Sequence, residues 1–500
     1  MKKKNNSVFI ISLAITIVVV ALGLIIPKQF AAGMDAAFAF LTNNFSWLYL
    51  ISMFVFVVFS LGIAFSKYGK IKLGPDDSKP EHSTVSWFAM LFGAGMGIGL
   101  VFWGVAEPLN HYVSFGMTEE AANLAMRKSF MHWGFHPWAG YAVVGMALGY
   151  FQFRKKAPGL ISSIFLPVLG EEGVRGPVGK AIDVCAVFAT VAGVATSLGQ
   201  GALQINGGLN EMFNIPQNIV VQILIVLVIT IIYTGTAVSG IDKGIKRLSD
   251  INMVLAVALM LGAFLLGPTL KEVNIFTNSF GDYVGNFIQD SFAINPFGDN
   301  SWLNGWTIFY WAWWIAWGPF VGTFIARISR GRTIREFVLG VICVPAVVSM
   351  IWFALFGGLG LNLENSIILQ AIEKTETALF IVFGQYPLSF IMSTIAVLLL
   401  CTFFATSGNS ATFVLAMFSS NGDLNPSKSK KLLWGVIQAV LALVLLMTGG
   451  LAALQTCSVV AAFPFAIIML FSCVCLVKAL KSEESGMPMY QPKAKKLKNK

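Results

Sequence analysis

The feature that most constrains this chain is a succession of long apolar runs separated by short polar segments. We count twelve runs that approach or exceed the ~20 residues that an α-helix needs to cross a bilayer. They lie near residues 8–26, 46–66, 85–106, 134–153, 181–208, 217–237, 251–268, 303–326, 337–360, 385–418, 432–449 and 452–477. Because unpaired backbone groups are costly in lipid, we expect an all-α polytopic membrane protein with twelve transmembrane helices.

The composition and the distribution of charge support this interpretation. Of the 500 residues, 56% are apolar and 12% are charged, whereas soluble domains carry roughly 25% charged residues. The net charge of +10 does not indicate nucleic-acid binding, because the basic residues lie in short loops on alternate sides of the expected spans. They cluster after the second, fourth, sixth, eighth and tenth spans and in the tail. The positive-inside rule therefore predicts that both termini are cytoplasmic.

A run of glycines interrupts the third apolar segment. Gly93, Gly95, Gly97 and Gly99 occupy every second position, and each costs roughly 1 kcal/mol relative to alanine in a helix. We expect an unwound segment, which at membrane depth is tolerated only inside the protein or beside a cavity. Its freed carbonyls and half-helix end would hold a cation and a carboxylate respectively. The alternative is close helix packing through small residues, which usually follows a spacing of four.

Residues 310–320 read YWAWWIAWGPF and carry four tryptophans without a charge. On a helix, Tyr310, Trp313, Trp314 and Trp317 share one face. A face of π-systems in an apolar segment suits a cation that cannot form hydrogen bonds, such as a quaternary ammonium. The alternative is an interfacial aromatic belt. We favour the cation cage because these residues lie near the middle of their run.

Two further patterns indicate a transport site between internal repeats. Gly318-Pro319 is a second group of helix breakers, in the eighth run, and Thr406 and Ser407 in the tenth run offer hydroxyls for Na⁺ or for their own helix backbone. If spans three to seven and eight to twelve form five-helix units, the second unit must be inverted, with broken helices opening both. The expected organisation is an N-terminal tail with two peripheral helices (1–84), a first repeat (85–268), an external connection (269–302), a second repeat (303–477) and a basic cytoplasmic tail (478–500).

Four strings make the chain resemble the betaine/choline/carnitine transporter family. They are GAGMGIGLVFWGVAEPLNHY at 93–112, HWGFHPWAGY at 132–141, YWAWWIAWGPFVGTFIARISRGRTIREF at 310–337 and FFATSGNSA at 403–411. The resemblance implies two N-terminal helices before a LeuT-like five-plus-five inverted-repeat core. It also implies a transporter rather than an enzyme, assembled as a homotrimer in the plasma membrane of a bacterium.

By position, the resemblance also implies a substrate site and two ion sites. The aromatic box would comprise Trp133, Trp138, Tyr141 and Trp314, with Met96 beside the substrate, and the route to the cytoplasm would be lined by Trp313, Trp317 and Phe102. One Na⁺ site would use Gly93, Met96, Phe403, Thr406 and Ser407, and a second would use Ala94, Met96, Thr190 and the ring of Phe320. A second hydroxyl expected one turn after Thr190 is replaced by Val194, which leaves the ion stoichiometry open.

We therefore expect Na⁺-coupled uptake of glycine betaine without a cofactor, with choline or carnitine as the alternative substrate. A neutral zwitterion gains nothing from the membrane potential, whereas each Na⁺ supplies about 2.3 kcal/mol per 100 mV. Charge balance requires no buried acid, and we expect none in spans three, four and eight. The rival classes are a channel and a membrane enzyme with a metal or haem on His132 and His136. No carboxylate or cysteine joins that pair at ligand spacing, so we expect no transition metal.

Overall fold

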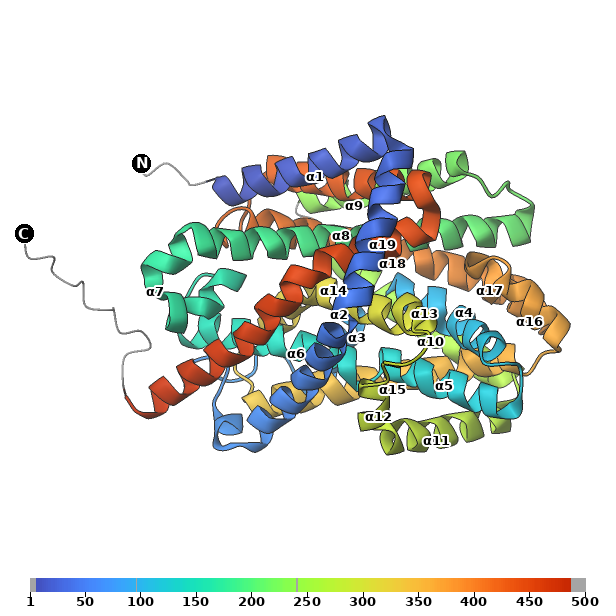
Figure 1. The fold of residues 1–500 in the computed structure, drawn as a ribbon, viewed down its shortest axis with the longest axis horizontal. Helices are drawn as coiled ribbons and strands as arrows, with labels where there is room; N and C mark the ends of the chain where they lie inside the picture. The colour runs from blue at the N-terminus through green and yellow to red at the C-terminus, as the bar shows by residue number, and fades with distance from the viewer. Residues whose placement is uncertain (1–5, 96, 240–241, 487–500) are drawn as a thin grey trace, which may run out of the picture.

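The computed structural model describes residues 6–95, 97–239 and 242–486, which form a helical bundle (Figure 1). Among these residues the regular structure outside helices is one isolated bridge between Lys72 and Thr333. Nine helices of this part of the chain are long and apolar enough to cross a membrane. They belong to α1 (Ser7–Ile25), α2 (Pro27–Phe65), α8 (Pro177–Phe213), α9 (Ile219–Ser239), α10 (Asp242–Leu266), α14 (Phe309–Ile328), α15 (Ile334–Leu361), α18 (Ser389–Phe418) and α19 (Lys428–Glu484).

Shorter helices complete the bundle. The α-helices are α3 (Thr84–Gly95), α4 (Ile98–Ser114), α5 (Glu119–Trp133), α6 (Phe135–Gly149), α7 (Leu166–Arg175), α11 (Thr269–Gly285), α12 (Phe287–Ser291), α13 (Ser301–Leu303), α16 (Asn365–Ile372) and α17 (Ala378–Phe383). Single π-helical turns occur at η2 (Tyr150–Arg154) and η4 (Asn304–Ile308). The 3₁₀ turns are η1 (Lys67–Lys70), η3 (Ile161–Phe165) and η5 (Thr375–Thr377).

Every apolar run of the sequence coincides with helical structure. The described residues nevertheless contain nine long apolar helices, fewer than the twelve runs. The third run is divided between α3 and α4, and the fourth corresponds to α6 with the following π turn. The last two runs join in α19, which bends at Gly449 and Gly450. Gly450 has a φ of +59°, which favours glycine because it lacks a Cβ.

The expected break in the glycine stretch is confirmed. α3 ends at Gly95 and α4 begins at Ile98, and Gly97 between them is extended, with φ −148° and ψ −156°. Four glycines within seven positions remove the side-chain contacts and the helix propensity that would hold one continuous helix. Two half-helices therefore meet at this point of the third run.

The break expected at Gly318-Pro319 is wrong, because α14 continues through Pro319 to Ile328. The glycines of this segment serve packing instead. A Cβ on Gly322 would lie 2.6 Å from Cγ1 of Val144, so its absence lets α14 lie directly against α6. Neighbouring groups can satisfy the backbone that a proline frees in a membrane helix, which makes an unbroken helix tolerable here.

Among the nine helices long and apolar enough to cross a membrane, the one that contains α14 is the most enclosed. All its residues from Phe309 to Gly322 are buried, and it packs against α6, α8 and α19 (Figure 1). By contrast, α1, α9 and α10 expose many large apolar side chains, as expected for helices that face lipid. The aromatic stretch therefore lies in the interior of the bundle.

Candidate substrate site

The four residues expected to form the aromatic box lie together. Trp133 ends α5, Trp138 and Tyr141 lie one turn apart on α6, and Trp314 lies on α14. Ring centroids are 4.8 Å apart for Trp133 and Trp314, 5.9 Å for Tyr141 and Trp314, and 5.5 Å for Trp138 and Tyr141. All three pairs are edge-to-face, and all four side chains are buried. This arrangement presents differently oriented π faces around one region.

The Tyr141 hydroxyl gives this apolar group a polar handle. It is buried and has no hydrogen-bond partner among the described residues. A buried hydroxyl without a partner is costly, and a ligand that accepts or donates a hydrogen bond there would relieve the cost.

A sharp corner between α5 and α6 brings Trp133 beside Trp138. Gly134 forms the corner with φ −89° and ψ −133°. A Cβ at Gly134 would clash with the Phe130 carbonyl oxygen and would lie 2.8 Å from Cε of Met350. Glycine is therefore required for the close approach of the two helices at this point.

The glycine stretch also contacts the box. A Cβ on Gly99 would clash with Cη2 of Trp313 and would lie 3.1 Å from Cη2 of Trp133. The first turn of α4 thus lies against the indoles, with the helix break next to it in the chain. The N-terminus of a helix carries a partial positive charge, which favours a carboxylate.

The three residues expected to line the exit are only partly brought together. Trp313 stacks on Trp314 at 5.3 Å and lies edge-on to Trp317 at 6.5 Å. Trp317 Nε1 donates to the Gly193 carbonyl at 2.9 Å. Phe102 packs on Trp103 at 4.8 Å, one turn beyond Gly99 toward the other end of α14. No ring contact joins Phe102 to Trp313 or Trp317 among the described residues.

The first expected ion site is partly assembled around the helix break. Ser407 Oγ lies 3.8 Å from the position of a Cβ on Gly97, so α18 faces the break. Thr406 Oγ1 donates to the Thr402 carbonyl at 3.0 Å and accepts from Asn252 Nδ2 at 3.1 Å. Of the other residues in this set, Gly93 is on α3 and Phe403 is buried on α18, whereas Met96 lies outside the described residues.

The second expected ion site combines three helices. Ala94 lies in the last turn of α3, Thr190 Oγ1 donates to the Ala186 carbonyl at 2.8 Å, and the Phe320 ring packs on Trp317 at 5.4 Å. Trp317 contacts α8 at Gly193, one turn from Thr190, so α8 and α14 meet at this level. In both ion sites the threonine hydroxyl donates to its own helix backbone, the alternative that the sequence left open.

Sequence reasoning missed the buried carboxylate of Glu107. The expectation of no buried acid at the site is wrong, because α4 continues past the expected end of the third span at residue 106 and buries Glu107 completely. Glu107 Oε2 accepts hydrogen bonds from Trp133 Nε1 at 2.8 Å and from the Tyr310 hydroxyl at 2.5 Å. One signal was in the sequence, since Glu107 and His111 have the i, i+4 spacing that places side chains on one helix face.

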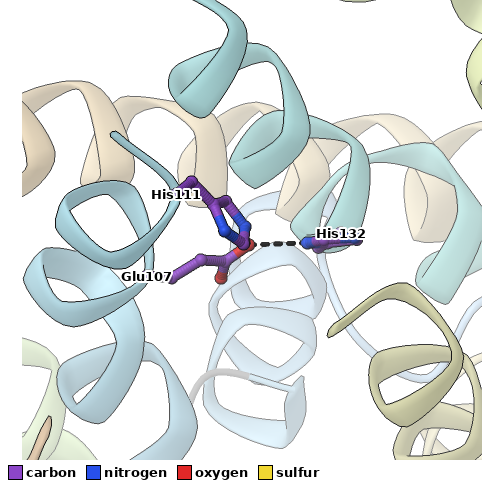
Figure 2. Close-up of side chains that lie close together, drawn as sticks. All are labelled: Glu107, His111 and His132. Carbon is purple, nitrogen blue, oxygen red and sulfur yellow. Dashed lines mark hydrogen bonds and ion pairs between the residues drawn. The ribbon is translucent and has the colours of Figure 1, made fainter. Parts of the chain in front are cut away.

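The pairing of His132 with His136 is also wrong. His136 contacts Ser291 Oγ at 2.7 Å, whereas His132 contacts Glu107 and Thr307. Ligand atoms of Glu107, His111 and His132 lie within 4.8 Å of one another, and Figure 2 shows these three side chains close together. Tertiary packing thus supplies a carboxylate and a second histidine that the local spacing did not.

A large apolar cavity lies apart from the box. It has a volume of about 770 Å³ and lies between α2, α12 and α15. Its lining includes Val57, Phe135, Phe287 and Ile342 but no residue of the box and no charged side chain. None of the four grouped aromatic side chains of the box lines it, so we place the candidate site at the box.

Comparison with known proteins adds independent information. A family model described as "BCCT, betaine/carnitine/choline family transporter" matches residues 7–485. The chain is 51% identical over 491 residues to the glycine betaine transporter OpuD of Bacillus subtilis, covering 97% of this chain and 96% of that protein. It is 49% identical over 492 residues to a probable glycine betaine transporter of Desulfitobacterium hafniense, covering 96% and 98%. It is 43% identical over 490 residues to an ectoine/hydroxyectoine transporter of Virgibacillus pantothenticus, covering 96% and 97%.

Proposed function

Because this chain belongs to the betaine/carnitine/choline transporter family, we propose that it imports glycine betaine together with Na⁺ by alternating access. It is a multi-pass membrane transporter and not an enzyme. The observation that carries the choice of substrate is the group of four buried aromatic side chains contributed by α5, α6 and α14.

The chemistry of the box matches a trimethylammonium zwitterion. A quaternary ammonium cannot donate hydrogen bonds, so aromatic faces replace its hydration, at about 0.5–2 kcal/mol for each desolvated contact. Edge-to-face packing of Trp133, Trp314 and Tyr141 is the geometry that offers faces in several directions. The substrate carboxylate would lie toward the positive N-terminus of α4 beside Gly99, with Met96 proposed to adjoin it.

Na⁺ is the proposed coupling ion, and no cofactor takes part. The helix break, with Ser407 facing it, supports a site of backbone carbonyl and hydroxyl oxygens, which a hard cation prefers. The first site would use Gly93, Met96, Phe403, Thr406 and Ser407, and the second Ala94, Met96, Thr190 and Phe320.

We further propose twelve membrane crossings arranged as two peripheral helices and two inverted five-helix repeats. The repeats span 85–268 and 303–477, with the external segment 269–302 between them. The bend of α19 at Gly449 and Gly450 supports two crossings within that helix. The protein would assemble as a homotrimer in the plasma membrane, with both termini in the cytoplasm.

One relative supports a second substrate class. The relative named as an ectoine/hydroxyectoine transporter is 43% identical to this chain, and choline and carnitine remain the substrates to compare within the family. Ectoine carries N–H donors that a trimethylammonium lacks, and the unpartnered Tyr141 hydroxyl offers them an acceptor.

Uptake by the purified protein in liposomes tests both the substrate and the ion. We expect saturable accumulation of labelled glycine betaine that requires an inward Na⁺ gradient, and weaker competition by choline, carnitine and ectoine. Accumulation driven equally well by a proton gradient without Na⁺ would refute the Na⁺ coupling. Stronger competition by ectoine than by glycine betaine would refute the substrate assignment.

A further inference from the structure

A buried carboxylate lies directly behind the aromatic box. Glu107 Oε2 accepts from Trp133 Nε1 and the Tyr310 hydroxyl, and its Oε1 lies 2.6 Å from His132 Nδ1 and 3.2 Å from His111 Nε2. Figure 2 shows both imidazoles turned toward this carboxylate. An ionisable side chain at membrane depth is costly, and its presence usually indicates a functional site.

The hydrogen-bond partners indicate where the protons are. An indole N–H only donates, so Trp302 Nε1, 3.3 Å from His111 Nδ1, requires that nitrogen to be an acceptor. His111 is therefore neutral and directs its Nε2 proton at Glu107. Trp133 likewise donates to the other carboxylate oxygen. A carboxylate that receives several donors is stabilised as the anion, with the proton of the short contact on His132.

The charge of this carboxylate has no strong cationic partner. His111 is neutral, and His132 is neutral when Thr307 donates to its Nε2. The two basic side chains of α5 form their own ion pairs, Lys128 with Asp290 at 2.7 Å and Arg127 with Asp282 at 3.3 Å and Asp290 at 3.1 Å. Among the described residues no lysine or arginine pairs with Glu107. A buried anion with neutral partners produces a negative potential that extends over nearby groups.

The Trp133 side chain connects this carboxylate to the box. The Trp133 side chain donates its N–H to Glu107, its Cη2 lies 3.1 Å from the Cβ position of Gly99, and its ring is perpendicular to that of Trp314 at 4.8 Å. Trp314 is tied to the same cluster, because its Nε1 donates to the His132 carbonyl at 2.9 Å. Removal of the carboxylate would leave a buried indole N–H without an acceptor and would free the ring to turn.

We propose that Glu107 is a positioning residue of the substrate site that also determines its preference for a positively charged headgroup. Its carboxylate orients Trp133, enriches the indole π face by accepting its N–H, and provides the negative charge that balances a bound quaternary ammonium. The inference rests on the proposed function, because it concerns the same box.

A metal ion at Glu107, His111 and His132 is the competing interpretation. Both imidazole nitrogens that face the carboxylate donate protons to it in the arrangement described above, and both remote nitrogens are engaged by Trp302 and Thr307. A metal ligand needs a free lone pair on nitrogen. The cluster therefore fits a closed hydrogen-bond network and not a metal site.

Matched ligands that differ only in charge test the proposal. Glycine betaine is compared with 3,3-dimethylbutanoate, and choline with 3,3-dimethylbutan-1-ol, in which carbon replaces the charged nitrogen. Affinities are measured by calorimetry on the full-length protein in lipid nanodiscs. For wild type we expect the charged member of each pair to bind more tightly. In Glu107→Gln we expect this preference to fall about tenfold in both pairs.

Two further variants distinguish the effect of the Glu107 charge from a change in the position of Trp133 and from the nonspecific effect of losing a buried carboxylate. Glu107→Asp keeps the charge but shortens the reach to Trp133, so affinity for both members should fall together while their ratio remains that of wild type. Asp183→Asn removes a buried carboxylate that accepts from Ser162 Oγ at 2.8 Å on α8, and should leave the ratio unchanged. Thermal unfolding of each variant verifies that it is folded, and Glu107→Asp provides the test if Glu107→Gln does not fold.

The outcomes are distinct. An unchanged ratio in Glu107→Gln, a lost ratio in Glu107→Asp, or an equal loss in Asp183→Asn would overturn the proposal. Stoichiometric metal found by elemental analysis in wild type and absent from Glu107→Gln would overturn it in favour of a metal site. If wild type prefers choline over its neutral analogue but does not bind glycine betaine, the proposed substrate fails while the role of Glu107 is still tested by the choline pair.

Discussion

At the scale of single residues, Trp314 has the largest predicted effect on substrate binding. Its ring meets Trp133 at 4.8 Å and Tyr141 at 5.9 Å, so it takes part in two of the three ring pairs of the box, and it also stacks on Trp313 at 5.3 Å. Trp314→Leu should raise the KM for glycine betaine at least about tenfold, because it removes a desolvated cation–π contact. Uptake at substrate concentrations near the wild-type KM should then fall to about a fifth of wild type or less, as measured in proteoliposomes.

The matched control for this variant is Trp47→Leu. Trp47 lies on α2 with half of its side chain exposed and is not part of the box. We expect wild-type KM in this control and similar thermal stability in both variants. Saturable uptake with an unchanged KM in Trp314→Leu would contradict the assignment of Trp314 to the substrate site.

Glu272 provides a prediction about pH. It lies in the first turn of α11, outside the nine helices that are long and apolar enough to cross a membrane, and both carboxylate oxygens are buried without a hydrogen-bond partner among the described residues. Burial raises the pKa of Glu272 to about 7. The pKa of Glu272 is higher in the folded protein than the value of about 4.5 in the unfolded chain. This group therefore contributes its full stabilisation of the folded state below about pH 4.5, and that stabilisation is lost as the pH rises through 7.

Glu272→Gln should therefore become more stable than wild type as the pH rises. We expect equal unfolding temperatures near pH 5 and an advantage of about 2 °C or more for the variant at pH 8. Glu119→Gln, at an exposed position on α5, serves as the control and should show no such trend. A constant difference between Glu272→Gln and wild type across this pH range would show that the carboxylate does not titrate as expected.

The residues of the box were predictable, but the polar cluster behind it was not. Trp314 lies in an aromatic stretch that is visible in the sequence, whereas Trp133, Trp138 and Tyr141 were expected only from the resemblance to a known family. Glu107 meets Tyr310 and His132 only after α4, α5 and α14 have packed. Such contacts depend on tertiary geometry, so the local spacing of His132 and His136 predicted the wrong partners.

At the scale of helices, glycine content predicted one break correctly and another wrongly. The stretch from Gly93 to Gly99 concentrates the helix penalty of four glycines and separates α3 from α4. In α14 the glycines at 318 and 322 lie against neighbouring helices, where close packing compensates for their low helix propensity. Whether a glycine breaks a helix or packs it depends on the facing helix, which one sequence does not reveal.

Gly99→Ala tests the contact between α4 and the box. A Cβ at this position would clash with Cη2 of Trp313, and the rigid buried indole cannot turn aside without disturbing Trp314. We expect the KM for glycine betaine to rise about tenfold, because the displaced ring alters a site that must be held within about 0.5 Å. The measurement is again uptake in proteoliposomes.

Gly62→Ala is the matched control for this substitution. Gly62 lies inside α2 and a Cβ there would meet no atom within 4 Å. This variant should keep the wild-type KM and gain slightly in stability, since alanine has the higher helix propensity. An unchanged KM in Gly99→Ala would contradict the proposed contact between the glycine stretch and the bound substrate.

At the scale of the whole molecule, basic residues that follow the second, fourth and tenth expected spans lie at the same end of the bundle as both described ends of the chain. The start of α1 and the end of α19 both lie at the left of Figure 1. The loop after α2 pairs with the end of α19 through Lys67 and Glu484, and Arg154 binds Glu483 at 2.6 Å. Lys430 reaches Asn6 at 3.4 Å. This gathering of positive charge supports the proposed cytoplasmic side by the positive-inside rule.

The number of coupled ions determines how steeply the whole protein can concentrate its substrate. Val194 is fully buried on α8 one turn after Thr190, where a hydroxyl would complete the second proposed ion site. Because this hydroxyl is missing, we expect the second proposed site to bind Na⁺ only weakly and wild type to couple one Na⁺ to each substrate. At 100 mV one ion supplies about 2.3 kcal/mol, which is under two decades of accumulation at about 1.4 kcal/mol per decade.

Val194→Thr should increase the coupling. Threonine has nearly the shape of valine, and its hydroxyl can bond to the carbonyl one turn earlier when no ion is present. With a second ion, accumulation at 100 mV should approach about three decades, and the Hill coefficient for Na⁺ should rise from one toward two. The steady-state ratio of internal to external glycine betaine is measured in proteoliposomes with equal Na⁺ on both sides and a potassium diffusion potential. Val194→Ala is the control. Wild-type accumulation near three decades would show instead that two ions are coupled without this hydroxyl.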